Sequence, residues 1–276
     1  MWHLLVVAAL TGLATPLGAL PFLVARELGR RAYDTLLGFG AGLMLAAATL
    51  GLLPAALHRV RVDDHVDAAR LATVLAGFLG GVAVLALLDR LIPHMHAGGH
   101  HGHQESEPDE AHGHEHCAHP TVDERARHQG LLVLGAMALH RLPEGFAIGA
   151  GFASGATRPL GVVLAVAVGI QNAVEGAVMA APLRRGGLSG AKLIGLVALT
   201  GASVPVAALA GFHLAATVTG ALPIALSLAA GALIYLACSE IIPESHSHAN
   251  ERRATIGLLA GFVLVILLQT LGGHVD

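Results

Sequence analysis

Two short segments place polar side chains in the middle of long apolar stretches. The first reads His140-Arg-Leu-Pro-Glu-Gly145, and the second reads Gln171-Asn-Ala-Val-Glu-Gly176. Both run polar, polar, apolar, Pro or Val, Glu and Gly, with an offset of 31 positions. Polar and ionisable groups deep in a membrane span are costly and usually functional. The residues of this repeated pattern are therefore the first candidates for a functional site.

The spacing puts possible metal ligands on shared helix faces. His140 and Glu144 are four positions apart, as are Gln171 and Glu175, so each pair lies on one face of its helix. A short connection makes the two helices antiparallel neighbours, and at about 1.5 Å per residue both pairs lie near the bilayer midplane. One imidazole, two carboxylates and an amide oxygen then converge, a set that suits Zn²⁺ and its first-row neighbours.

A structural role for these residues is the alternative. A single buried His–Glu pair could merely tie two helices together, but two matched sets at matched depth argue against this interpretation. Pro143 adds a second feature, because it cannot donate a hydrogen bond to the carbonyl of Leu139 and kinks the helix. A freed carbonyl beside the ligands helps to line a polar cavity, where broken helices are tolerated.

The composition indicates a membrane protein. Of 276 residues, 54% are hydrophobic and 13% are charged, whereas soluble domains carry about a quarter charged residues. A formal net charge of −3 gives no basic surface for nucleic acid, and two cysteines do not make a disulfide framework. The 35 glycines fall largely in small-xxx-small patterns that let membrane helices approach closely. We therefore expect membrane lipid, and no nucleic acid, as a partner.

The expected fold is an all-α integral membrane protein with eight transmembrane helices. Lipid satisfies no backbone group, and the strict alternation of a membrane barrel is absent. The N-terminal segment lacks a basic region and a cleavage site, so we interpret it as a retained first span. The eight apolar segments are 3–24, 34–57, 71–93, 130–153, 159–183, 190–214, 221–243 and 254–272.

Basic residues predict the orientation of these spans. With the N-terminus outside, eleven Arg and Lys residues fall in inner loops: Arg26, Arg30, Arg31, Arg90, Arg125, Arg127, Arg184, Arg185, Lys192, Arg252 and Arg253. The outer loops hold four, which are Arg59, Arg61, Arg70 and Arg158. The positive-inside rule then predicts both termini outside, which is the periplasmic side of a cell inner membrane.

A polar, His-rich segment separates the third and fourth spans. It divides the chain into helices one to three at 1–93, a cytoplasmic loop at 94–129, and helices four to eight with the metal site at 130–276. The loop has no apolar period, so we expect disorder. Imidazole binds Zn²⁺, which favours a metal-capturing loop over a plain solvated linker. The capturing residues would be His100, His101, His103, His112, His114, His116 and His119.

The sequence resembles the ZIP (Zrt/Irt-like) family of metal transporters, in particular its bacterial members. The likeness covers nearly the whole chain: eight spans, outside termini, a His-rich loop between spans three and four, and the paired H-x-x-P-E-G and Q-N-x-x-E-G segments. Residues 40–47 in the second span and 230–244 in the seventh are also similar to the family. The two paired segments together are highly specific.

The resemblance implies a binuclear metal centre. In the family, its second half uses an Asn directly after the His, the residue after the Gln, both glutamates, and a Glu just before a proline in span six. Asn172 is present here and joins the expected metal ligands. The first half would consist of His140, Glu144, Gln171 and Glu175, with Met44 as a thioether contributor.

Two positions depart from the family's pattern. Arg141 stands at the Asn position, and Val204 stands before Pro205 at the Glu position. A guanidinium stays charged even when buried, and Arg141 can pair with Glu144 at i, i+3. We therefore expect Arg141 to take the place of the second metal and to compensate the charge of the glutamates, which makes the site mononuclear. The alternative is that Arg141 turns into a water-filled vestibule.

Spans three and seven both end at the inner side with clustered polar residues. Ordinary helix capping and interfacial charge are one interpretation of them, especially near the end of span seven. In the family, the equivalent positions resemble a route by which metal leaves for the cytoplasm. The expected exit path consists of Asp89, His94, His96 and Glu240, extended to Glu244 and His246.

The sequence therefore predicts a non-enzymatic transporter that imports a divalent transition metal, with Zn²⁺ as the expected substrate. It leaves Cd²⁺, Fe²⁺, Mn²⁺ and Co²⁺ open as substrates, and a homodimer open as the assembly. The resemblance implies an elevator-like movement of spans 1, 4, 5 and 6 against spans 2, 3, 7 and 8. The alternatives are an intramembrane metalloenzyme, a metal exporter and a metal sensor; no H-E-x-x-H motif supports the first.

Overall fold

The computed structural model describes residues 1–25, 27–62, 65–91, 122–155, 160–185, 187–188, 190–218, 220–247 and 249–272. The predicted all-α class is confirmed, since helices make up almost all of these ranges. The strands of the described part are the two-residue β1 (Arg61–Val62) and β2 (His65–Val66), which pair antiparallel. The long helices are α1 (Trp2–Ala19), α2 (Arg30–Ala46), α4 (Ala68–Leu91), α5 (Val122–Ala153), α6 (Leu160–Arg185), α7 (Gly190–Gly201), α8 (Ser203–Thr217), α9 (Ala221–Leu236) and α11 (Glu251–Gly272).

Short helical pieces extend or join these helices. The 3₁₀ segments are η1 (Leu20–Leu23) and η3 (His58–Val60). The α-helical pieces are α3 (Leu53–Leu57) and α10 (Ile242–Ser245). The π-helical segments are η2 (Ala47–Leu52) and η4 (Ala237–Ile241).

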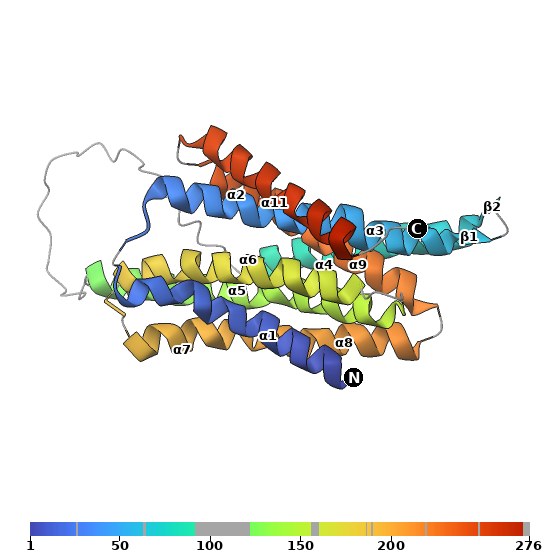
Figure 1. The fold of residues 1–276 in the computed structure, drawn as a ribbon, viewed down its shortest axis with the longest axis horizontal. Coiled ribbons are helices and arrows are strands. Elements are labelled where there is room, and N and C mark those ends of the chain that lie inside the picture. The colour runs from blue at the N-terminus through green and yellow to red at the C-terminus, as the bar shows by residue number, and fades with distance from the viewer. Residues whose placement is uncertain are drawn as a thin grey trace, which may run out of the picture.

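Seven helical segments of the described chain are long and apolar enough to cross a membrane. α5 has 32 residues and carries the polar segment that begins at His140, so it completes the eight expected crossings. In Figure 1, α1 begins and α11 ends toward the same end of the molecule, which agrees with an even number of crossings. The chain is therefore a multi-pass membrane protein.

The helices form two bundles that lie against each other (Figure 1). The site bundle consists of α1, α5, α6, α7 and α8, and the support bundle consists of α2, α3, α4, α9 and α11. Helices α5 and α8 pack closely within the first bundle, as α2 and α11 do in the second. Between the bundles, α5 contacts α9 and α2 contacts α6. The site bundle corresponds to spans 1, 4, 5 and 6.

Glycines bring backbones together within each bundle. An added Cβ at Gly149 would overlap the carbonyl of Ala208 on α8, and one at Gly42 would overlap that of Leu258 on α11. Every described glycine whose added Cβ would overlap the backbone of another helix joins helices of the same bundle. The contact between the bundles is made through side chains, as where Gly40 lies beside the side chain of Gln171.

The helices differ from the predicted spans mainly at their polar ends. α5 begins at Val122, within the segment expected to be disordered, and α2 begins at Arg30. Helical hydrogen bonds continue beyond the apolar stretch because the backbone does not need lipid to stay helical. The two π-helical segments are features that the sequence analysis does not predict. Each is followed by a proline, Pro54 or Pro243, which removes a backbone donor.

Candidate metal site

The polar segments of α5 and α6 face the interior of the molecule, within the site bundle and toward the support bundle. Their ionisable and amide side chains are all buried, so none of them faces lipid. Pro143 lies inside α5, within the first of these two segments. The buried side chains are His140, Arg141, Glu144, Gln171, Asn172 and Glu175.

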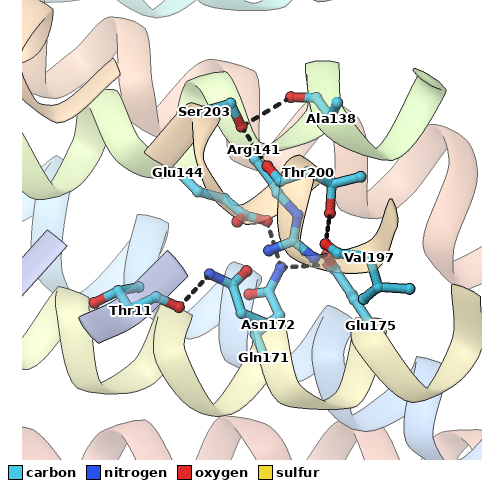
Figure 2. Close-up of polar contacts among 10 residues, drawn as sticks. All are labelled: Thr11, Ala138, Arg141, Glu144, Gln171, Asn172, Glu175, Val197, Thr200 and Ser203. Atoms are coloured by element: carbon cyan, nitrogen blue, oxygen red, sulfur yellow. Dashed lines mark hydrogen bonds and ion pairs between the residues drawn. The ribbon is translucent and has the colours of Figure 1, made fainter. Parts of the chain in front are cut away.

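Gln171 connects the two carboxylates of the site. Its Nε2 atom donates to Oε1 of Glu144 at 2.8 Å and to Oε1 of Glu175 at 2.9 Å. Figure 2 shows the amide between the two acids. The predicted convergence therefore holds for these three side chains. In a buried, low-dielectric place, two carboxylates attract a cation more strongly than they would in water.

Arg141 pairs with the carboxylate of the neighbouring helix. Its Nη2 atom lies 3.3 Å from Oε2 of Glu175, and its side chain is fully buried. The expected pairing with Glu144 is therefore wrong, and so is the alternative of a vestibule-facing arginine. The amide of Gln171 binds both acids, and Oε2 of Glu144 has no hydrogen-bond partner among the described residues. The Nε and Nη1 atoms of Arg141 have no hydrogen-bond partner among the described residues.

His140 turns toward the support bundle. Its Nε2 atom lies 3.1 Å from Oε2 of Glu240 in η4. The prediction that His140 joins the other three donors at one point does not hold in this conformation. In the described part of the chain, no group of three or more His, Cys, Asp and Glu side chains lies close enough to hold a metal ion. His140 and Glu240 instead link α5 to the end of α9.

Known proteins with similar sequences identify the family of this chain. The model of the ZIP zinc transporter family matches residues 1–269. The chain belongs to the ZIP zinc transporter family. The resemblance stated from the paired segments is thus confirmed, and this ZIP protein is a transporter rather than an enzyme.

Individual bacterial relatives match over almost the whole chain. The zinc transporter GufA of Myxococcus xanthus is 38% identical over 267 residues, which cover 96% of this chain and 97% of that protein. The zinc transporter ZIPB of Bordetella bronchiseptica is 37% identical over 258 residues, covering 93% and 77%. The zinc transporter ZupT of Corynebacterium aurimucosum is 31% identical over 264 residues, covering 93% and 92%.

The remaining expected ligands lie around the amide–carboxylate network of this ZIP protein. Met44 is fully buried in α2, one turn after Gly40, which lies beside Gln171. Asn172 donates from Nδ2 to the backbone carbonyl of Thr11 on α1 at 3.0 Å. The Oδ1 atom of Asn172 is buried without a hydrogen-bond partner in the described chain. Asn172 therefore ties α6 to α1 and directs its amide donor away from the two acids (Figure 2).

The position that departs from the family in span six is tightly packed. Val204 is fully buried in α8, and its carbonyl oxygen would lie 2.5 Å from a Cβ added to Gly145. Beside it, the hydroxyl of Ser203 donates to the carbonyl of Thr200 at 2.7 Å and to that of Ala138 at 3.3 Å (Figure 2). An apolar side chain at 204 thus leaves Arg141 as the additional charged group beside the glutamates.

The described part of the expected exit path lies at the end of the molecule where α4 and α10 end. Asp89 lies in the last turn of α4, Glu240 lies in η4, and Glu244 follows in α10. These three acids therefore come from the ends of the two spans that the sequence analysis assigns to the path. The other expected members, His94 and His96, lie outside the described residues, as do the loop histidines from His100 to His119.

His246 is held by contacts on both of its ring nitrogens. Its Nδ1 atom lies 2.9 Å from the Ser245 hydroxyl and 2.9 Å from the Ile242 carbonyl. Its Nε2 atom lies 3.2 Å from the hydroxyl of Thr255 on α11. In this conformation His246 therefore ties α10 to α11, which is the structural role that the sequence analysis keeps as the alternative for this end.

Two contributors to the site are missed by sequence reasoning. Thr11 accepts the amide of Asn172 and donates from its own hydroxyl to the carbonyl of Ala165 at 3.2 Å, so it fixes α1 against α6. The one sign of this contact in the sequence is that Thr11 is a polar residue within an apolar span. The sequence analysis places Glu240 on the exit path but not beside His140. Pro243, three residues after Glu240, is the sign that its helix is locally widened.

Proposed function

We propose that this ZIP protein imports Zn²⁺, or a related divalent ion, into the cytoplasm through the buried site between α5 and α6. The observation that carries the proposal is the pair of buried carboxylates, Glu144 and Glu175, held 2.8 Å and 2.9 Å from one amide nitrogen. Relatives named as zinc transporters support Zn²⁺ as the substrate. Uptake of Fe²⁺, Mn²⁺, Co²⁺ and Cd²⁺ is to be compared with uptake of Zn²⁺ in the experiment below.

Binding requires a change at Gln171. A donor nitrogen occupies the point between the acids, so a cation there needs the amide to rotate and present its oxygen. His140 completes the set when it leaves Glu240. Zinc accepts nitrogen and carboxylate oxygen ligands at about 2.0–2.2 Å, so this change brings both acids closer to the ion than they are to the amide.

Arg141 supports a mononuclear site. Its buried guanidinium stays charged and neutralises Glu175 at 3.3 Å. A second divalent ion would have to occupy the region of this fixed cation. We expect one tightly bound Zn²⁺ in the parent protein and a second one after Arg141→Asn combined with Val204→Glu. Two tightly bound ions in the parent at the midplane would contradict this part of the proposal.

The accessibility of the buried side chains supports one direction of release. The exposed fraction of the side chain rises from 4% at Glu175 to 10% at His140 and 23% at Glu240. Glu240 lies in the last part of its span, at the end where α4 also ends. This gradient supports release toward that end, which the distribution of Arg and Lys makes cytoplasmic. Both termini are then periplasmic in an inner membrane.

The packing supports an elevator-like movement of the two bundles. Glycine contacts lock the helices within each bundle, whereas no described glycine has an added Cβ that would overlap a backbone of the other bundle. Interlocked backbones move as a unit, and the interface between the bundles can slide because it lacks such backbone-to-backbone overlap. The site bundle would then carry the ion past the support bundle.

Ion-resolved uptake into proteoliposomes tests the proposal. The parent is expected to accumulate Zn²⁺ inside vesicles, with acid reducing uptake because protons compete for imidazole and carboxylate ligands. The double variant His140→Ala with Glu144→Ala is expected to lose uptake, while Glu251→Gln, an exposed residue of α11 away from the site, keeps it. Retained uptake in the double variant would contradict the assignment. Measurement with and without a pH gradient identifies a coupled proton.

A further inference from the structure

A cavity of about 560 Å³ lies between the beginnings of α2 and α11, at the end of the support bundle away from the termini. It is separate from the metal site, because its walls come from the N-terminal part of α2, the N-terminal part of α11 and the two residues before α11. Its lining combines two arginines with small polar and apolar groups: Thr35, Ala249, Asn250, Arg252, Arg253 and Ile256.

The two arginines give the cavity positive charge. Arg252 and Arg253 are exposed, and neither side chain makes a hydrogen bond or an ion pair with another described residue. Arg30 and Arg31 begin α2 on the same side and are exposed as well. The acids beside these four arginines include Glu251 in the first turn of α11 and the buried Asp34.

The wall behind the arginines is preformed. The Nδ2 atom of Asn250 donates to Oδ2 of buried Asp34 at 2.8 Å, which ties α11 to α2. The carbonyl of Asn250 accepts the backbone N–H of Arg253 at 2.8 Å and so begins the helix. Added Cβ atoms at Gly38 and Gly257 would overlap the facing helix, so the two backbones lie in direct contact. Little ordering is therefore needed when a ligand binds.

The apolar side of the cavity continues onto the lipid-facing surface of α11. Ile256 lines the cavity and is 59% exposed. Leu259 and Val263 follow it along the helix and are also exposed. A ligand with a charged head and a hydrocarbon chain would place each part against a matching surface. A free inorganic anion would contact the arginines and leave the apolar surface uncovered.

We infer that this cavity binds the phosphate headgroup of an anionic phospholipid, with an acyl chain lying along Ile256 and Leu259. Basic pockets between transmembrane helices on the cytoplasmic side bind such headgroups, and that leaflet carries the anionic lipids. Arginine suits phosphate because its planar fork binds two oxygens at once. The lipid would hold the support bundle at a fixed depth while the site bundle moves.

Lipid binding to the detergent-solubilised full chain tests the inference. The probes are phosphatidylglycerol, phosphatidylcholine with the same acyl chains, and inorganic phosphate, read out by native mass spectrometry and by the shift in Tm. The parent is expected to retain phosphatidylglycerol in preference to phosphatidylcholine. In Arg252→Gln with Arg253→Gln, affinity should fall about 30-fold, because each basic residue contributes about 1 kcal/mol near an anionic surface.

The control removes the same charge elsewhere on the same end. Arg90→Gln with Lys192→Gln changes two exposed residues that do not line the cavity, and it should keep the preference for phosphatidylglycerol. Equal loss in both double variants would overturn the inference in favour of a diffuse basic surface. Unchanged binding in Arg252→Gln with Arg253→Gln would overturn it too, as would an equal Tm shift with inorganic phosphate.

Discussion

His140 and Glu240 join the two bundles: Nε2 of His140 on α5 lies 3.1 Å from Oε2 of Glu240 in η4. The same imidazole is a proposed metal ligand, so the acid and the ion compete for it. In the proposed transport cycle, Glu240 would bind His140 again as the metal leaves.

Glu240→Gln is expected to slow release of the ion. The amide keeps a polar contact with His140 but removes the negative charge that attracts the departing ion. We expect the maximal uptake rate in proteoliposomes to fall about tenfold, since conduction needs a site from which the ion can leave. Zinc binding to the purified protein should change much less. Glu251→Gln serves as the control, and an unchanged uptake rate in Glu240→Gln would remove Glu240 from the path.

Arg141→Gln is expected to destabilise the protein strongly. It leaves Glu175 as a buried charge without its partner, and breaking a buried pair in this way costs about 3–5 kcal/mol. Added Zn²⁺ should restore part of the lost Tm because it neutralises the acid. Arg70→Gln breaks the exposed pair with Asp67, which should cost no more than about 1 kcal/mol. Equal Tm values for both variants would contradict the compensating role of Arg141.

Adjacent glycines in α4 test the close packing inside the support bundle. An added Cβ at Gly81 would overlap the carbonyl of Leu228 on α9, whereas one at Gly80 meets nothing within 4 Å. Gly81→Ala should lower the free energy of unfolding by about 1–3 kcal/mol through overpacking. Gly80→Ala should be neutral or stabilising by up to about 1 kcal/mol, since alanine favours a helix. The reverse order of the two Tm values would refute the α4–α9 arrangement.

Arg59 links the bundles at the end opposite Glu240. It donates from Nη1 to the carbonyl of Ala55 at 2.6 Å and from Nη2 to that of Ser154 at the end of α5 at 3.0 Å. Arg59→Ala should increase amide hydrogen exchange about tenfold at the end of α5, because a charged hydrogen bond contributes about 1.5–3 kcal/mol. Arg70→Ala, whose contacts stay within the support bundle, is the control. Equal exchange in both variants would argue against this link.

The spacing of the paired segments is sufficient to predict which residues face the interior. Glu144 and Gln171 meet because an i, i+4 pattern on two neighbouring helices defines one face on each. Seven of the expected crossings follow from apolar length in the same way, and the eighth is α5, which carries a polar segment. These features depend on local periodicity, which the sequence contains directly.

The partners of the charged residues cannot be predicted in the same way. Local spacing favours a pair between Arg141 and Glu144 along one helix, but the packing of α5 against α6 brings Glu175 within reach. His140 meets Glu240, which is 100 positions away in the sequence. Such pairs depend on how the helices and bundles are placed against each other, and local spacing carries no information about that placement.

Anomalous X-ray scattering at the zinc edge, from crystals of the zinc-loaded full chain, would locate the transported ion. We expect one strong peak between the carboxylates of Glu144 and Glu175, with the side chain of Arg141 still beside it. A zinc peak elsewhere in the molecule, with none between these two acids, would rule out the proposed site.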